Sequence, residues 1–356
     1  MAKRPMEVPE ALPYPIVDNH THLESVIAFR NNEITVEKLL SDAYQAGVTR
    51  IIQVGCDLNS ATWTDTLLRD RRPVVSRRGV AAPQPTDGAY ETTNPSVEGV
   101  ETNTPSVVGS FELPSVEPVE TTASAPQPNL ASVLGAIAIH PNEAVLHAKI
   151  HEIAKDGLEP NPLPHHEFPL DEAIQQIYNI AKDNPKIRAI GETGMDLFRA
   201  GTKGEKAQAE SFRAHIQMAK ELDLALQIHD REAHSQVIDI LLKDGAPAKT
   251  VFHCFSGDAD MAKFCATQGW YLSFAGPVTY KANDELRAAL AQTPLDLLLV
   301  ETDAPYLTPH PYRGQANAPY AANYTTRAIA EYLNRPLTEI CEAISKNSER
   351  VYGPWN

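Results

Sequence analysis

Eight short apolar stretches, most of them separated by longer amphipathic stretches, constrain the fold of this 356-residue chain more than any other feature. Amphipathic patterns typical of helices lie between them, for example at residues 36–47, 170–184 and 207–223. The predicted strands are residues 15–22, 50–57, 134–141, 187–194, 224–230, 250–257, 271–276 and 295–303. Strands that alternate with helices form parallel sheets, and eight such units close into a barrel. We therefore predict an α/β fold, a (β/α)8 TIM barrel.

One segment, residues 71–129, interrupts this alternation. It is rich in Pro, Ser, Thr, Val and Glu and lies between the helical pattern after the second strand and the third strand. Such a composition buries too little apolar surface to fold alone. We expect a single domain over residues 1–356, with 71–129 as a flexible insertion away from the chemistry. A partner-binding arm is the alternative for this segment.

Charge and composition exclude several classes of protein. The formal net charge of -15 argues against a broad basic surface for nucleic acid, although a cleft lined by metal ions stays possible. The four cysteines form no Cys-x-x-Cys pair, and we find no signal peptide. No stretch approaches the roughly 18 apolar residues of a membrane span. We expect a cytoplasmic protein without membrane contact, and nothing indicates an obligate protein partner.

Polar residues cluster where the predicted strands end, which is where a TIM barrel carries its active site. The first strand ends in Asp-Asn-His-Thr-His, with Asp18, His20 and His22 at alternate positions. Alternate residues of a strand point the same way, so we expect these three side chains to share one face. Two imidazoles in this spacing can bind one cation.

Four other predicted strands end in a residue of the same kind. Glu192 ends the fourth, His229 the fifth, His253 the sixth and Asp303 the eighth. Each alone has an ordinary explanation, such as a helix cap, a core histidine or a turn residue. Their occurrence at the same end of one barrel favours a metal site with more than one cation.

Neighbouring strands allow the ligands to be assigned. Residues from adjacent strands would share a cation, namely His20, His22 and Asp303 in one group and His229 and His253 in the other. Glu192 can bridge the two groups through its two oxygens. A pair of cations lowers the pKa of a water molecule, and Asp303 can orient that water and take its proton. Glu192 and Asp303 are therefore the catalytic candidates, with Glu301 and Asp196 as possible partners of the ligands.

The motifs DNHTH, IHPNEA, GETGMD, IHDREA, HCFSGD and ETDAPYLTPHPYRGQANAP, in this order, resemble the TatD family of metal-dependent hydrolases in the amidohydrolase superfamily. The resemblance runs from about residue 17 to the C-terminus, interrupted by the insertion. It implies a TIM barrel with two divalent cations, which in this family are zinc, manganese or magnesium. It also implies a 3′-5′ exodeoxyribonuclease that acts on DNA ends.

The same resemblance assigns roles to particular residues. The family's metal ligands match the six found above: His20, His22, Glu192, His229, His253 and Asp303. Its substrate-facing positions match His140, Arg231 and Arg313. Two features depart from the family pattern: the insertion, and Ala318 where Asn-Glu-Pro would be usual.

Other histidines are expected to lie outside the site. His147 and His151 are spaced i, i+4 but lack the glutamate of an HExxH motif, so a solvated helix face is expected. His165 and His166 adjoin prolines and are expected in a surface loop.

Two other functions stay open. The same metal site could serve a hydrolase of another ester or amide, in a small molecule or an aminoacyl-tRNA. A non-catalytic metal-binding scaffold that binds partners through its insertion is the third possibility.

Overall fold

A computed structural model of the chain describes residues 5–69, 129–155 and 157–355. Eight strands form one sheet in which every neighbouring pair is parallel, in the order β1 to β8. Their bounds are β1 Ile16–Thr21, β2 Val48–Gly55, β3 Ser132–Ile137, β4 Ile187–Asp196, β5 Ala225–Arg231, β6 Thr250–Phe252, β7 Tyr271–Phe274 and β8 Leu298–Val300. The predicted TIM barrel is confirmed.

The barrel closes between β1 and the segment that follows β8. Thr21 and Ala304 form a parallel bridge there. The Asp303 N–H donates to the His20 carbonyl at 2.9 Å, and the His22 N–H donates to the Ala304 carbonyl at 2.9 Å. Three of the expected metal ligands are thus held by the backbone bonds that close the barrel.

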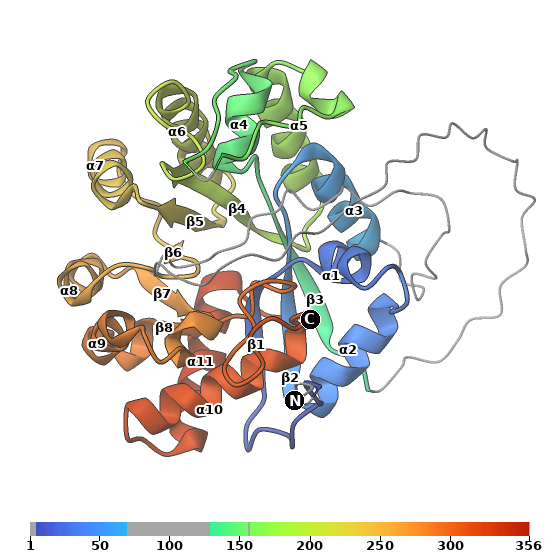
Figure 1. Ribbon diagram of the computed structural model, residues 1–356, viewed down its shortest axis with the longest axis vertical. Helices are drawn as coiled ribbons and strands as arrows, with labels where there is room; N and C mark the ends of the chain where they lie inside the picture. Colours follow the sequence, from blue (N-terminus) through green and yellow to red (C-terminus); the bar gives the residue numbers. More distant parts are fainter. Residues whose placement is uncertain (1–4, 70–128, 156, 356) are drawn as a thin grey trace, which may run out of the picture.

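Helices surround the strands (Figure 1). Their bounds are α1 Leu23–Phe29, α2 Val36–Gln45, α3 Leu58–Arg69, α4 Pro141–His147, α5 Leu170–Asp183, α6 Glu205–Glu221, α7 His234–Asp244, α8 Ala259–Thr267, α9 Asp284–Gln292, α10 Ala322–Tyr332 and α11 Leu337–Tyr352. Local signals fix several helix starts. The Thr35 side chain accepts from the Lys38 N–H to begin α2, and Asp258 accepts from the Met261 N–H to begin α8.

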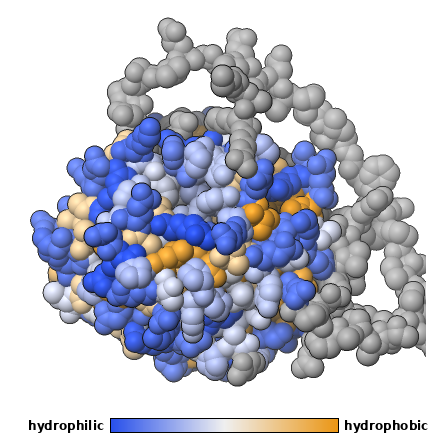
Figure 2. Space-filling model, turned by 90° about the horizontal axis from the view of Figure 1, so that it is seen from below, coloured by the Kyte–Doolittle hydropathy of each residue, from blue (hydrophilic) through white to orange (hydrophobic). Residues whose placement is uncertain are grey.

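Two apolar cores result from the alternation of side chains along the strands. The larger core lies between strands and helices and includes Ile16, Ile51 and Phe252. The smaller core consists of alternate strand residues together with the end of α11: Val17, Ile52, Val54, Leu134, Ala136, Ala189, Ala225, Val251, Leu299, Val351 and Tyr352. On the face seen in Figure 2, hydrophilic residues predominate and hydrophobic patches lie between them.

Five strands are shorter than predicted, and β6 and β8 differ most. Strand β6 ends at Phe252 rather than at residue 257, and the residues Leu295–Leu297 form a 3-10 helix before β8. After β6 and β8 the chain turns through a residue of positive φ, Cys254 at 40° and Asp303 at 50°, which ends the extended conformation. His253 and Asp303 therefore lie just beyond the strands that position them.

The predicted insertion, residues 71–129, lies outside the described residues except for its last residue. The elements on either side agree with its expected place, because α3 ends at Arg69 and β3 begins at Ser132. In the described part of the chain, no helix combines the length and apolar character needed to cross a bilayer.

Candidate metal centre

Glu192 lies at the centre of four buried histidines at the C-terminal end of the barrel. Its Oε1 is 2.6 Å from His229 Nδ1 and 2.9 Å from His253 Nε2. Its Oε2 is 3.6 Å from His20 Nε2 and 3.9 Å from His22 Nε2. One carboxylate thus contacts imidazoles from both expected ligand groups, as its assignment as a bridge requires.

Asp303 completes the first group. Its Oδ1 lies 3.4 Å from His22 Nε2 and 3.8 Å from His20 Nε2, and the two Nε2 atoms are 3.3 Å apart. Its Oδ2 is buried without a hydrogen-bond partner in the described residues. A buried carboxylate oxygen without a partner is costly, and a cation would satisfy it.

The outer nitrogens of His20 and His22 make hydrogen bonds that define the ring tautomers. His20 Nδ1 lies 3.1 Å from the Gln227 side-chain oxygen, and His22 Nδ1 lies 3.1 Å from the Val54 carbonyl. Both partners are acceptors, so each Nδ1 carries the proton. In the neutral rings the facing Nε2 atoms both present lone pairs, an arrangement that a cation between them would stabilise.

The other two histidines, His229 and His253, also donate a ring proton to an acceptor outside the centre. His229 Nε2 donates to Asp196 Oδ2 at 3.2 Å, and His253 Nδ1 donates to Glu301 Oε1 at 3.0 Å. Asp196 and Glu301 thus lie next to the expected ligands His229 and His253, where the sequence placed them. When the rings are neutral and keep these protons, His20, His22, His229 and His253 point four imidazole lone pairs inward beside two carboxylates. This donor set fits divalent transition-metal cations.

The charges of the centre shift the pKa values of its histidines. Burial opposes protonation of His22, but the hydrogen bond with Asp303 outweighs it and raises the pKa to about 9. Burial likewise opposes protonation of His229, and its bonds with Asp196 and Glu192 raise the pKa to about 9. Burial and the nearby His253 lower the pKa of His20. Burial also opposes protonation of His253, but the charges of Glu192 and Glu301 outweigh it and raise its pKa. Protons therefore compete with cations at His22, His229 and His253.

His140 also lies close to Glu192 and His229. Its Nε2 lies 3.5 Å from Glu192 Oε1, and its ring groups with Glu192 and His229. The resemblance assigned it a substrate-facing position, and its closeness to the ligands was not expected. Its Nδ1 accepts from the Asn142 N–H at 3.1 Å and caps α4. A neutral His140 therefore carries its proton on Nε2 and presents a donor, unlike the other four histidines.

The expected shared face of Asp18, His20 and His22 is wrong for Asp18. Strand β1 shifts its register between Asp18 and Thr21. The Asp18 carboxylate accepts from the Thr302 N–H at 2.9 Å and from the Thr302 hydroxyl at 2.6 Å. Asp18 instead ties β1 to the segment after β8.

Comparison with known proteins agrees with this geometry. Residues 17–353 match the family described as TatD related DNase. The TatD protein of Mycobacterium tuberculosis, called an uncharacterized metal-dependent hydrolase, is 33% identical over 95% of this chain and 98% of its own length. The chain belongs to the TatD family of metal-dependent hydrolases. The family assignment from the sequence motifs is confirmed.

Two solved structures show how closely the barrel follows TatD folds. The YjjV protein of Escherichia coli aligns over 95% of this chain and 98% of its own, with a TM-score of 0.66 and 22% identity. A TatD family hydrolase of Entamoeba histolytica aligns over 97% and 100%, with a TM-score of 0.66 and 16% identity. At these identities the likeness concerns the fold alone.

A pocket of about 350 Å³ opens beside the candidate metal centre, the group formed by Glu192, Asp303 and the four histidines around them, which we call the TatD metal centre. In the described residues its lining includes Arg231 but not Arg313. The Arg231 guanidinium lies over the Phe198 ring at 3.9 Å, and that of Arg313 lies over the Tyr280 ring at 4.2 Å. Of the three expected substrate-facing residues, His140 and Arg231 thus share the pocket.

The pocket wall is strongly acidic. Arg199 and Arg231 contribute its only lysine or arginine charges among the described residues. Eight carboxylates line it: Glu24, Asp57, Glu143, Glu152, Glu159, Glu192, Asp196 and Asp303. A polyanion would meet repulsion there unless bound cations offset the carboxylates.

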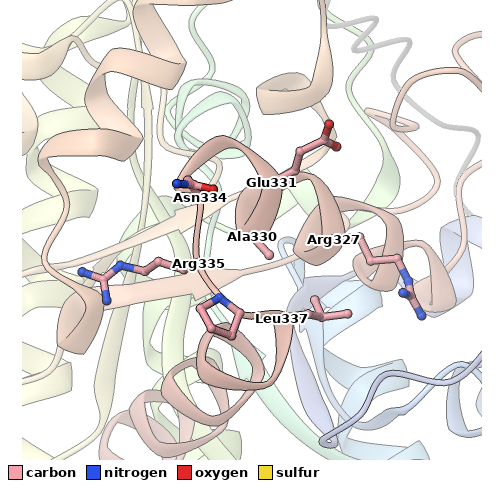
Figure 3. A pocket seen from close by; sticks show the side chains of 7 residues that line it. Arg327, Ala330, Glu331, Asn334, Arg335 and Leu337 are labelled. Atoms are coloured by element: carbon pink, nitrogen blue, oxygen red, sulfur yellow. The ribbon is translucent and has the colours of Figure 1, made fainter.

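A second hollow, of about 590 Å³, lies away from this centre, between α10 and α11. The side chains of Arg327 and Arg335 point to opposite sides of it (Figure 3). Arg335 pairs with Glu339, and Arg327 donates to Asn323 and to the Glu10 carbonyl. Their charges therefore do not converge on a shared ligand.

The surface placement expected for three histidines is wrong. His147, His165 and His166 are only 2%, 7% and 1% exposed. His147 is the last residue of the seven-residue helix α4, and it packs against His165 and His166 of the connection between α4 and α5. His151 is exposed, as expected, but it lies in the connection after α4 and not on a helix face. The burial of a loop residue leaves no periodic signal in the sequence. The sequence pattern therefore predicted surface positions for histidines that are buried.

Proposed function

We propose that this chain is a 3′-5′ exodeoxyribonuclease that hydrolyses DNA phosphodiesters at two divalent cations. The observation that carries the hydrolytic part is the set of four imidazole nitrogens that point inward around Glu192 and Asp303. The substrate part rests on the family description, TatD related DNase.

Zinc, manganese or magnesium would fit the mixed nitrogen and oxygen donors. His20, His22 and Asp303 would hold one cation and His229 and His253 the other, with Glu192 between them. When bound, the cations supply Lewis acidity that makes a water molecule more acidic and polarises the phosphoryl group.

The chain's own residues would handle the proton and the substrate. Asp303 can accept the proton of the attacking water at Oδ2, the oxygen that has no hydrogen-bond partner among the described residues. His140 can donate a hydrogen bond from Nε2 to a phosphate oxygen, because its Nδ1 is occupied by the α4 cap. Arg231, which lies over Phe198, and Arg313, which lies over Tyr280, can contact the DNA backbone.

The test is hydrolysis of a 5′-labelled single-stranded oligonucleotide by metal-loaded protein. We expect labelled products that shorten progressively, because removal from the 3′ end leaves the label in place. Asp303→Asn keeps the shape of the side chain and should lower the rate by about 10²- to 10⁴-fold, the range for a lost general base. Full activity in this variant would disprove the proposed role of Asp303.

The acidic wall of the pocket supports a second candidate, hydrolysis of an ester or amide in a less anionic small molecule, or of the ester of an aminoacyl-tRNA, whose aminoacyl end carries a cationic ammonium group. The carboxylates of Glu24, Glu152 and Glu159 would favour a cationic or neutral group. Metal-loaded protein that spares DNA but cleaves an aminoacyl ester would decide for this candidate. Failure on all substrates, with cations bound, would favour the scaffold alternative.

A further inference from the structure

A second group of histidines lies outside the TatD metal centre, beside helix α4. Ring nitrogens of His147, His165 and His166 lie within 4.8 Å of one another. A second group with the same spacing consists of Asp57, Glu143 and His165. His165 belongs to both groups and therefore lies between an imidazole side and a carboxylate side.

His147 has a buried nitrogen without a partner. Its Nδ1 donates to the Phe168 carbonyl at 2.8 Å, so its Nε2 carries a lone pair. That Nε2 is buried and has no hydrogen-bond partner in the described residues. Native proteins rarely leave such an acceptor unsatisfied, and a cation beside the other histidines would satisfy it.

Glu143 supplies the negative charge. Its Oε2 accepts from His166 Nε2 at 2.6 Å and from His165 Nε2 at 3.3 Å. Burial opposes its ionisation, but these two hydrogen bonds outweigh burial and lower its pKa to about 2. His166 Nδ1 accepts from the Leu163 N–H at 2.7 Å, so His166 keeps its proton on Nε2 and orients the carboxylate.

His165 can become a ligand without losing a proton to solvent. The Asn59 amide nitrogen now donates to His165 Nδ1 at 3.0 Å. A half-turn of that amide would present its oxygen, and the ring proton would move from Nε2 to Nδ1. The Nε2 lone pair would then be available beside Glu143.

We propose that His147, His165 and Glu143 hold a further divalent cation of the zinc class, with His166 positioning Glu143. Two imidazoles and one carboxylate form a known zinc ligand set that leaves one coordination position open. Glu143 also lines the pocket of the metal centre. The cation would fix the connection between α4 and α5 to α4 and offset part of the acidic wall.

The experiment is zinc content per chain, measured by mass spectrometry after zinc loading and desalting of tag-free protein. His147→Asn removes Nε2, while its amide can still donate to the Phe168 carbonyl. We expect it to hold one zinc ion fewer than the wild type. His151→Asn is the matched control, since His151 is exposed in the same connection, and it should match the wild type. Equal zinc content in His147→Asn and the wild type would overturn the proposal.

A second measurement guards against a folding defect. In the His20→Ala/His22→Ala variant the TatD centre lacks two ligands, but the His147 group is intact. Added zinc should still slow amide hydrogen exchange in the segment Pro164–Glu167, and this slowing should vanish when Glu143→Gln is added. No slowing would count against the site. Neither readout depends on hydrolysis, so the proposed function and this site can fail separately.

Discussion

At the scale of single residues, the carboxylate behind His229 carries a testable consequence. Asp196 Oδ2 accepts from His229 Nε2, and Asp196 Oδ1 accepts from the Phe198 and Arg199 N–H groups at 3.0 and 2.8 Å. Loss of such a partner typically lowers metal affinity about 10- to 100-fold. We expect Asp196→Asn to weaken metal binding by that factor, measured by competition with a chromophoric chelator.

Asp230→Asn is the control for this prediction. Asp230 lies on the same strand as His229, but its carboxylate bonds His234 of α7 at 2.7 Å. Its substitution should leave metal affinity near that of the wild type. Equal losses in both variants would mean that Asp196 acts through general destabilisation rather than through the His229 ring.

The buried side chain of His215 makes the stability of the fold depend on pH. It is buried on α6, where its Nε2 accepts from the Ile139 N–H at 3.2 Å and its Nδ1 donates to the Ser211 carbonyl at 2.7 Å. Burial lowers its pKa from 6.5 to about 4. Below pH 6.5 the unfolded chain therefore binds a proton that the folded chain does not, and stability falls until about pH 4.

We expect the His215→Gln variant to lose less stability than the wild type on acidification. Between about pH 7.5 and pH 4.5 the difference should reach about 2–3 kcal/mol, the linkage contribution of the lowered pKa. Urea unfolding at both pH values measures it. The exposed His151→Gln should show the wild-type pH dependence. Parallel losses in His215→Gln and the wild type would contradict the prediction.

At the scale of elements, Gly194 sets how closely β4 and β5 approach at the metal centre. Its φ is +144°, and a Cβ there would lie 2.0 Å from the His229 carbonyl oxygen. Gly194→Ala should therefore destabilise the fold by about 3 kcal/mol or more and displace His229, which lowers metal content. Urea unfolding and metal analysis measure both effects.

Gly157→Ala separates backbone strain from the steric clash. Gly157 also has a positive φ, +83°, but a Cβ there would meet nothing within 4 Å. We expect a loss of only about 1–2 kcal/mol from the left-handed conformation, with metal content unchanged. A comparable loss in both variants would show that close approach at Gly194 is not the limiting contact.

The strand ends also show what sequence can predict. His20, Glu192, His229 and Asp303 could be found because each follows an apolar run at one end of a regular barrel. Their hydrogen-bond partners could not be found in this way. Gln227, for example, meets His20 across 207 positions of sequence, and that contact depends on the closure of the barrel.

The conformation of the loops was the second feature that the sequence could not predict. The burial of His147, His165 and His166 depends on how the connection between α4 and α5 folds back, and no periodic pattern encodes that. The ends of β6 and β8 were missed for a related reason. Positive φ at Cys254 and Asp303 is imposed by tertiary contacts, since neither residue type requires it.

At the scale of the whole molecule, the negative charge of the chain and of the pocket wall bears on how an anionic substrate could bind. The chain carries a formal net charge of -15, and the pocket wall concentrates carboxylates instead of the arginines and lysines usual for a DNA-binding surface. Recognition of an anionic substrate would therefore depend on bound cations more than on the protein surface. The affinity for DNA should then fall only weakly as the salt concentration rises, because few lysine or arginine side chains contact phosphates.

The segment 71–129 gives the last prediction at this scale. The chain leaves the barrel after α3 and re-enters at β3, on the face opposite the strand ends that carry the metal centre. We expect replacement of residues 71–127 by a Gly/Ser linker to leave metal content and the rate of hydrolysis near their wild-type values, because long connections add little to the free energy of folding. Circular dichroism, metal analysis and the hydrolysis assay check this outcome. A folded deletion variant that loses activity but keeps its cations would show that the segment contacts substrate, and the single-domain interpretation would then need a functional arm.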